Sequence, residues 1–403
     1  MALLSVEDAV ARVLEGAVPL AAEQTKLIEA DGRVLAADLA ARRTQPPTAV
    51  SAMDGYAVRA EDVAAAPAGL KLIGEVAAGR PFDRKVGAGE AARIFTGGVL
   101  PIGTDTVVIQ EIAIRDGDHV VFNKMTPKGG NVRTAGLDFS QGEVLLGHGH
   151  RLTARDLALA AAMNYPELPV HRRPRIAVVA TGDELVMPGA TPGPGQIVYS
   201  NGFALMALAR REGAEIVDLG IVPDRLDDTI AAVRRGRELG ADILLTTGGA
   251  SVGDYDLVQK AFAAEGMALS FWKVALRPGR PLMHGRLGAM QVLGLPGNPV
   301  AAYVCAVLFL VPLIRRLAGR SDLFPASESA VLGCDLPAND ERADYIRARV
   351  TVRADGAPVV TPFPVQDSSM MTPLAKADCL LVRDAYAPSA TAGSACEIIR
   401  LDP

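Results

Sequence analysis

Between residues 175 and 317 the chain alternates short apolar runs with helical segments, and this alternation limits the fold more than any other feature. The runs are rich in Val, Ile and Leu, and they cover 175–180, 214–219, 241–246 and 290–295. Such a run indicates a strand buried on both faces, as in a parallel sheet covered by helices. The segments between and after the runs have helical periodicity. The sequence therefore predicts a doubly wound, mostly parallel α/β sheet.

The remainder of the 403 residues follows different patterns. Residues 5–40 and 153–163 have helical periodicity, whereas 70–146 contain short strands separated by Gly, Pro and Asp clusters. After residue 321 the helices stop and alternating strand patterns begin. We expect a multidomain α/β plus β protein with four domains: a discontinuous helical N-terminal domain (1–44 and 145–170), an inserted β-rich domain (45–144), the α/β domain (171–320) and a C-terminal β-barrel-like domain (321–403).

Composition excludes several functional classes. The formal net charge is −5 and aromatic residues make up 4%, which argues against a nucleic-acid partner. The longest apolar run, Val300–Ile314, contains Pro312 and is too short for a membrane span, so a buried helix and no membrane contact are expected. The four cysteines are isolated, which excludes a CxxC zinc site and favours a cytoplasmic protein.

Polar or glycine-rich loops follow the predicted strands, and ligands of open parallel sheets bind at these carboxyl ends. The loops are Thr181-Gly-Asp-Glu-Leu185, Val222-Pro-Asp224, Thr246-Thr-Gly-Gly-Ala-Ser-Val-Gly-Asp-Tyr-Asp256 and Pro296-Gly-Asn-Pro299. The topology should bring Glu184, Asp224, Asp254 and Asp256 to one rim, where four unpaired acids would repel one another. Glu184, Asp224 and Asp256 therefore predict a Mg²⁺–phosphate site, with Gly248 and Gly249 exposing backbone N–H groups to phosphate.

Some of these residues also have purely structural interpretations. Asp256 by itself is better explained as a helix N-cap, and the role of Asp254 stays open. Asn298 is expected to cap the last helix, with Pro299 in its first turn. The cations Lys273, Arg277 and Arg280 suit an oxyanion substrate, although surface charge explains any one of them about as well. No Ser/His/Asp arrangement or P-loop pattern is present.

Five motifs in a fixed order give the chain a recognisable pattern. They are Ser51-Ala-Met-Asp-Gly-Tyr-Ala57, Thr181–Leu185, Thr246–Asp256, Arg277-Pro-Gly-Arg-Pro281 and Gly294-Leu-Pro-Gly-Asn-Pro299. This pattern resembles the molybdopterin molybdenumtransferase family, which is related to the E domain of gephyrin. The resemblance implies a Mg²⁺-dependent enzyme that takes adenylylated molybdopterin, releases AMP and inserts molybdate. It also implies an elongated homodimer whose active cleft is shared between protomers.

The resemblance carries roles onto individual residues. Positions implicated in catalysis match Asp54, Thr96, Asp138, Glu184, Asp224 and Asp256, the last three as Mg²⁺ ligands. Positions around the substrate or molybdate match Arg133, Lys273, Arg277, Pro296, Pro299 and Ser369. Ser368 is an equally good match for the last of these. Gly248, Gly249, Ser251 and Arg280 are also expected to bind the substrate. Arg277 and Arg280 stand where bacterial relatives often have lysine, so a forked donor replaces a point charge.

Two other functions are compatible with parts of this pattern. A molybdopterin adenylyltransferase would resemble the sheet domain alone, and the motif at 51–57 and the C-terminal module argue against it. A non-catalytic, gephyrin-like scaffold could have lost its acids, whereas this chain keeps the carboxylates that the chemistry requires. Release of AMP from adenylylated molybdopterin distinguishes the transferase from both alternatives.

Overall fold

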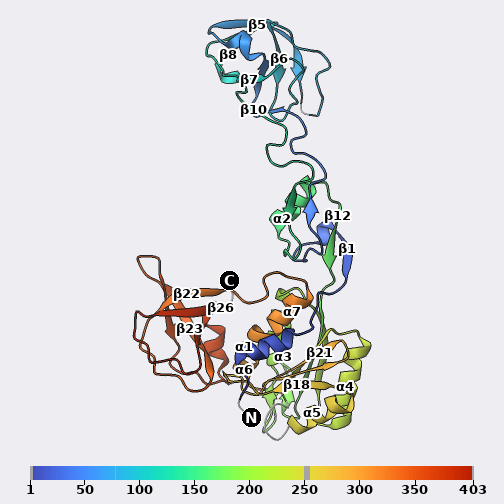
Figure 1. The fold of residues 1–403 in the computed structure, drawn as a ribbon, viewed down its shortest axis with the longest axis vertical. Helices are drawn as coiled ribbons and strands as arrows, with labels where there is room; N and C mark the ends of the chain where they lie inside the picture. The colour runs from blue at the N-terminus through green and yellow to red at the C-terminus, as the bar shows by residue number, and fades with distance from the viewer. Residues whose placement is uncertain (1–2, 78, 249–254, 402–403) are drawn as a thin grey trace.

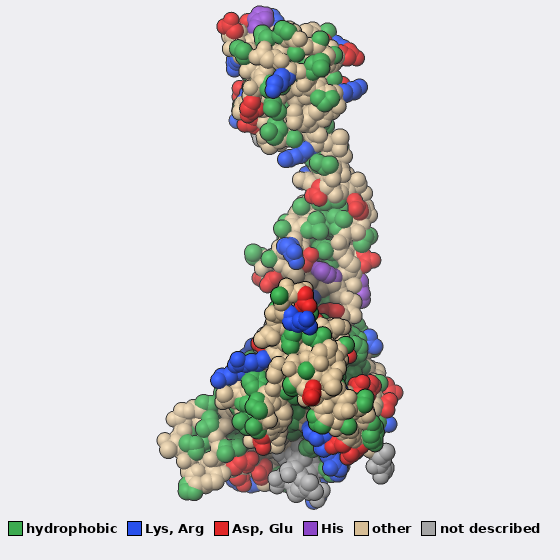
Figure 2. All heavy atoms as spheres, turned by 90° about the vertical axis from the view of Figure 1, so that its left-hand side faces the viewer, with side chains coloured by type: hydrophobic (Ala, Val, Ile, Leu, Met, Phe, Trp, Pro, Cys, Tyr) green, Lys and Arg blue, Asp and Glu red, His purple; other side chains and the backbone are tan. Residues whose placement is uncertain are grey.

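The computed structural model describes residues 3–77, 79–248 and 255–401, except for the side chains of Tyr255 and Asp256. The molecule is elongated (Figure 1): a broad base contains the α/β sheet and the C-terminal strands, and a narrow stem leads to a separate β domain at the far end. Acidic and basic side chains are interspersed over the base (Figure 2).

A six-stranded sheet forms the centre of the base, in the order β16-β13-β17-β21-β20-β18. The first four strands are parallel to one another, and β20 pairs antiparallel with both β21 and β18, which confirms the predicted mostly parallel sheet. The strands are β13 (Arg175–Thr181), β16 (Glu215–Val222), β17 (Ile243–Thr247), β18 (Ala268–Trp272), β20 (Met283–Leu287) and β21 (Met290–Leu295).

Helices cover both faces of this sheet. The helices are α1 (Val6–Leu14), α3 (Asn201–Arg211), α4 (Leu226–Glu238), α5 (Tyr255–Ala264), α6 (Pro299–Cys305) and α7 (Val311–Leu317), the last two joined by a π-helical stretch, η4 (Ala306–Leu310). Ile176 and Val178 of β13 belong to one core with α1, α3, α6 and α7. Ala177 and Val179 belong to the opposite core with α4 and α5. Successive side chains of a strand point to opposite faces, so a strand with two cores must be apolar throughout.

The segment Pro299–Leu317 is apolar and long enough to cross a bilayer by composition. It is the one such helix among residues 3–77, 79–248 and 255–401, and 83% of its most apolar window is buried inside the protein. Its buried side chains include Phe309 and Ile314, which pack in the core around α1 and α3. The segment is therefore a core helix, as the sequence predicted.

The stem and the distal domain are built from strands between α1 and β13. In the stem, β1 (Ala22–Lys26) pairs with β12 (Glu167–His171), β2 (Leu39–Ala40) pairs with β11 (Val144–Leu146), and α2 (Ala154–Ala162) has a Thr153–Asp156 capping box. The distal sheet has the order β7-β4-β6-β5-β9-β8. Its strands are β4 (Gly55–Val58), β5 (Ala68–Val76), β6 (Glu90–Ile94), β7 (Thr106–Ile109), β8 (Ala113–Asp116) and β9 (His119–Phe122).

The helical expectation for residues 5–40 is wrong beyond the first helix. Helix α1 ends at Leu14, because Gly16 follows in a left-handed conformation with φ 61° and Pro19 cannot continue the helix. The next apolar residues, such as Leu35, lie in extended segments of the stem. Helix α1 itself packs against α7 in the base, and the proposed four-domain division stays a prediction.

The C-terminal strands close into a small barrel. Strand β23 pairs with both β24 and β25, and the ring continues through β22 and β26. The elements are β22 (Ser327–Leu332), β23 (Ala343–Val352), β24 (Pro358–Pro362), α8 (Met371–Ala375), β25 (Cys379–Arg383) and β26 (Ala395–Arg400). The short strand β19 (Leu276–Arg277) leaves the α/β part and pairs with β23, which joins the two parts of the base.

A buried carboxylate fastens α3 to the end of α7. Glu212 is 7% exposed, and it accepts hydrogen bonds from Arg315 Nε at 2.8 Å and from Arg320 Nη1 at 2.9 Å. Burial would raise the pKa of Glu212, but the hydrogen bonds from Arg315 and the charges of Arg315 and Arg320 outweigh it and lower that pKa. Removing one partner of such a buried group leaves the other charges uncompensated.

We predict that Glu212→Gln destabilises the protein by about 3–5 kcal/mol, because the partly buried Arg315 loses its counter-charge and Arg320 keeps only Asp322. Glu215→Gln, which removes an exposed carboxylate 3.2 Å from Arg175, is the matched control and should cost about 0–1 kcal/mol. Thermal unfolding at pH 7 measures both. Since the pKa of Glu212 is lowered in the folded state, its contribution is present above the ordinary carboxyl pKa and is lost as the pH falls through the lowered value. Equal melting temperatures for the two variants would contradict the prediction.

Candidate functional site

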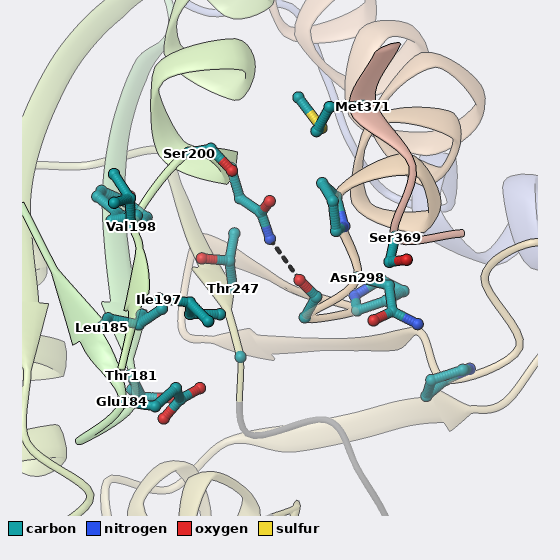
Figure 3. A pocket seen from close by; sticks show the side chains of 17 residues that line it. Thr181, Glu184, Leu185, Ile197, Val198, Ser200, Thr247, Asn298, Ser369 and Met371 are labelled. Carbon is teal, nitrogen blue, oxygen red and sulfur yellow. Dashed lines mark hydrogen bonds between the residues drawn. The ribbon is translucent and has the colours of Figure 1, made fainter. Parts of the chain in front are cut away.

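A pocket of about 580 Å³ opens at the carboxyl ends of the central strands. Thr181 ends β13, Thr247 ends β17 and Pro296 follows β21, and all three line the pocket (Figure 3). Ser369 and Met371, next to and at the start of α8, form the opposite wall. The pocket therefore lies between the α/β part and the C-terminal part, at the sheet edge where the sequence predicts a ligand.

Gly248 lines the pocket directly after β17. Its φ is 89°, a left-handed conformation that side chains rarely adopt. A Cβ at this position would lie 2.3 Å from the carbonyl oxygen of Thr181. Only glycine allows the ends of β13 and β17 to approach this closely, which explains the first glycine of the loop at 248–249.

The wall next to Glu184 is apolar. Leu185, Ile197 and Val198 line it, and the side chain of Tyr199 is buried behind it. A Cβ added to Gly202 would lie only 1.6 Å from the hydroxyl oxygen of Tyr199. The absence of a side chain at Gly202 therefore leaves space for the tyrosine ring. Burial, with a smaller effect of Asp218, raises the pKa of Tyr199 to about 12, so the phenol stays neutral near pH 7.

Two asparagines connect the loops around the pocket. Asn201 Nδ2 donates to the carbonyl oxygen of Gly297 at 2.7 Å (Figure 3), and Asn298 Nδ2 donates to Ser368 Oγ at 2.8 Å. Asn298 occupies the expected N-cap position of α6, and Ser200 occupies the N-cap position of α3, but neither side chain caps its helix. The expected capping role of Asn298 is therefore wrong, since its amide holds the C-terminal part instead.

A buried arginine supports the loop that carries Ser369. Arg347 is 1% exposed, and its guanidinium donates to the carbonyl oxygens of Asp367 at 2.9 Å and Met370 at 3.1 Å. Ser369 Oγ donates to Asp367 Oδ1 at 2.6 Å. Sequence reasoning missed Arg347 because an arginine in an alternating strand pattern usually faces solvent. It favoured Ser369 and Ser368 equally: the structure places Ser369 in the pocket and Ser368 against Asn298.

Of the predicted carboxylates, Glu184 and Asp224 have described side chains, and they lie in the loops after the neighbouring strands β13 and β16. Glu184 lines the pocket. The backbone N of Asp183 donates to Asp224 Oδ2 at 3.3 Å, and the backbone N of Asp224 donates to Asp183 Oδ1 at 3.2 Å. Helix α5 begins at Tyr255, so Asp256 lies in its first turn rather than at the N-cap. The Asp256 side chain and the residues Gly249, Ser251 and Asp254 lie outside the described part of the chain, within which no group of three metal-binding side chains occurs.

The three predicted cations have different environments. Arg277 is bound to two carboxylates of the C-terminal part, Asp340 at 2.7 Å and Asp344 at 2.8 Å. Lys273 lies with Nζ 4.0 Å from the centre of the Trp272 ring. Arg280 is exposed, and Pro281, directly after it, lines the pocket with Pro296 and Pro299.

Four predicted residues belong to the distal end of the molecule rather than to the pocket. Asp54 Oδ1 accepts hydrogen bonds from the backbone N and from Oγ1 of Thr96, both at 2.8 Å. These two hydrogen bonds lower the pKa of Asp54, and Arg93 adds a smaller effect. Arg133 is exposed on the short strand β10 (Val132–Arg133), and Asp138 is exposed where the chain returns to the stem. Figure 1 places the distal sheet at the opposite end from β13 and β21.

Family models match three successive parts of the chain. Residues 4–164 match the model described as the MoeA N-terminal region (domain I and II). Residues 177–316 match a probable molybdopterin binding domain, and residues 329–401 match the MoeA C-terminal region (domain IV).

Individual proteins are also similar to this chain. A molybdopterin molybdenumtransferase from Haemophilus influenzae is 32% identical over 404 residues, which cover 100% of this chain and 98% of that protein. A molybdopterin molybdenumtransferase from Nostoc is 42% identical over 311 residues, covering 74% and 70% of the two chains. The crystal structure of a molybdopterin biosynthesis MoeA protein from Pyrococcus superposes with a TM-score of 0.85 at 28% identity, covering 100% of both chains.

We predict that Gly248→Ala costs about 1–3 kcal/mol and narrows the pocket, because the new Cβ must displace the end of β13. Gly297→Ala is the matched control: it lies in the same pocket, and its Cβ would meet Gly248 Cα at an ordinary 3.8 Å. Thermal unfolding and crystal structures of both variants test this. An unchanged pocket in Gly248→Ala would contradict the close approach described above.

Proposed function

This chain belongs to the molybdopterin molybdenumtransferases, enzymes of molybdenum cofactor biosynthesis, and we propose that it releases AMP from adenylylated molybdopterin and inserts molybdate in a Mg²⁺-dependent reaction. The observation that carries the proposal is the pocket at the ends of β13, β17 and β21, which Ser369 of the C-terminal part completes. A cytoplasmic location belongs to the same proposal and is supported by the free cysteines at positions 305, 334, 379 and 396.

The composition of the pocket suits an adenylylated pterin. Helices α3 and α6 begin at Asn201 and Pro299, and both residues line the pocket. Helix N-termini offer unpaired N–H groups and partial positive charge to phosphate, and Gly248 lets its backbone approach an anion closely. The apolar wall of Leu185, Ile197 and Val198 suits a flat ring system.

The donor set at the rim fits Mg²⁺, which prefers carboxylate oxygen ligands. We propose Glu184, Asp224 and Asp256 as the residues that hold the ion. The buried hydroxyl of Thr181 supports a polar ligand here, because no hydrogen-bond partner for it occurs among the described residues and it lies 3.3 Å from the Cβ position of Gly248. When bound, Mg²⁺ would neutralise charge on the phosphate oxygens.

Lys273 and Arg280 are the cations that we assign to molybdate. Arg277 already binds Asp340 and Asp344, so its charge is compensated within the protein. Lys273 and Arg280 flank the turn that leads to Pro281 at the pocket. We propose that Ser369 borders the same substrate as part of the pocket wall, with its hydroxyl proton donated to Asp367 Oδ1.

The separation of the predicted residues supports a homodimer with a shared site. Asp54, Thr96, Arg133 and Asp138 lie toward the distal end, whereas Glu184 and Ser369 line the pocket in the base. In the structure the stem separates the two sets within one chain (Figure 1). We propose that the distal domain of a second copy supplies the first set to the pocket of its partner.

We predict that Glu184→Gln lowers AMP release from adenylylated molybdopterin on the order of 100-fold, because it removes a proposed metal ligand. The assay supplies molybdate and Mg²⁺, and Glu215→Gln, exposed at the opposite end of β16, is the control. Wild-type turnover in Glu184→Gln would exclude this carboxylate from the reaction. Absence of AMP release by the wild-type protein would favour the gephyrin-like scaffold, and ATP consumption with free molybdopterin would favour the adenylyltransferase.

We predict that a heterodimer of Asp54→Asn and Glu184→Gln chains, purified through two different tags, has about half of the wild-type activity. A shared site takes Asp54 from one chain and Glu184 from the other, so one of the two sites in this heterodimer is intact. The two mutant homodimers are the controls, and their activity should be on the order of 100-fold below wild type. An inactive heterodimer would show that each site is made within one chain.

A further inference from the structure

The Asp54–Thr96 pair stands on two loops that must be held in register. Asp54 lies in the turn between β3 (Val50–Ser51) and β4, and Thr96 follows β6. Both hydrogen bonds of Thr96 go to Asp54 Oδ1, and no hydrogen bond to Oδ2 is present among the described residues. Oδ2 is therefore the atom that can meet a substrate, and its direction depends on how the two loops are fixed.

The N-terminal side of the turn is fixed by a buried serine. Ser51 is 0% exposed, and its hydroxyl donates to the carbonyl oxygen of Met53 at 2.6 Å. Its backbone carbonyl accepts from Gly97 N at 2.9 Å, and its backbone N donates to Gly98 O at 2.8 Å. These contacts explain the serine of the 51–57 motif, but they do not reach beyond Met53.

The C-terminal side of the turn is fixed by Arg93, which stands opposite Tyr56 in the β4–β6 pair. Arg93 Nη1 donates to the carbonyl oxygen of Gly55 at 3.0 Å, and Nη2 donates to Gln110 Oε1 at 2.6 Å. Gln110 N donates in turn to the carbonyl oxygen of Asp54 at 3.1 Å. Arg93 thus closes a ring of contacts around the Asp54–Gly55 peptide.

The same guanidinium also reaches the loop that carries Thr96. It lies 4.8 Å from the ring centre of Phe95, the residue before Thr96, and 5.2 Å from that of Tyr56. No ion pair to Arg93 occurs in the described part of the chain. The Arg93 side chain therefore contacts Gly55, directly after Asp54, and Phe95, directly before Thr96. Through these contacts it can set the position of the Asp54 loop relative to the Thr96 loop.

We infer that Arg93 is a positioning residue for the proposed reaction, and that its forked guanidinium aims Asp54 by joining Gly55, Gln110 and Phe95. This inference rests on the proposed function of Asp54. Lysine at this position would keep the positive charge but lose the second hydrogen bond and the planar stacking. The two N–H donors and the planar shape of the Arg93 guanidinium, and not its positive charge alone, are therefore required.

The test compares four full-length proteins in the AMP-release assay: wild type, Arg93→Lys, Asp54→Asn and the double variant. Arg93→Lys should lower kcat on the order of 10-fold, with KM and the melting temperature close to wild type. In the Asp54→Asn background the same substitution should have no further effect, because Arg93 acts through Asp54. Arg115→Lys, which affects a hydrogen bond to Gly117 O at the far edge of the same sheet, is the control and should leave kcat unchanged.

The outcomes separate the inference from the proposed function. An equal loss of kcat from Arg93→Lys with and without Asp54 would overturn the inference, because Arg93 would then act independently. A wild-type kcat for Arg93→Lys beside a low kcat for Asp54→Asn would overturn it as well, while the role of Asp54 would stand. A wild-type kcat for Asp54→Asn would instead remove the role of Asp54, and the inference would fall with it.

Discussion

The parallel pairing of β13, β17 and β21 is the constraint on which the site depends. Its register places Ala180 beside Thr247 and Thr247 beside Leu295, so the loops after these strands begin at one edge. The backbone hydrogen bonds of the sheet define the relative position of the three strand ends, independently of the side chains that line the pocket. The close approach of Gly248 to the Thr181 carbonyl follows from the same pairing, and it places a glycine in the wall of the pocket.

The α/β part and the C-terminal barrel share an apolar core, to which Leu380 and Ile399 of the barrel belong, and charged groups add contacts between the two parts at several points. Arg277 joins β19 to Asp340 and Asp344, and Arg315 joins α7 to Glu212 and to carbonyl oxygens of the linker. Arg347 uses its guanidinium on carbonyl oxygens of the loop that borders the pocket. Such directional contacts define the relative position of two modules more narrowly than apolar packing does. The wall that carries Ser369 is consequently part of the same scaffold as the sheet.

Much of this arrangement could be predicted from local patterns. The apolar runs of β13, β17 and β21 and the glycine–acid loops after them indicated the sheet and the edge of the pocket. The helical prediction for 5–40 failed beyond Leu14, because periodic apolar residues such as Leu35 are also compatible with extended segments that share a core. The role of Arg347 could not be predicted, because its guanidinium donates to backbone carbonyl oxygens, and every residue has such an oxygen.

The sequence by itself determined the order of strands and loops, the carboxylates available for a metal and the resemblance to a family, because periodicity, turns and motifs are properties of neighbouring residues. Only the tertiary structure decided which cations are already compensated, which serine reaches the pocket and how far Asp54 lies from Glu184. Arg277 meets Asp340, and Ser368 meets Asn298, across modules that fold from separate stretches of chain. Such contacts depend on how the modules dock, and no local pattern encodes that docking.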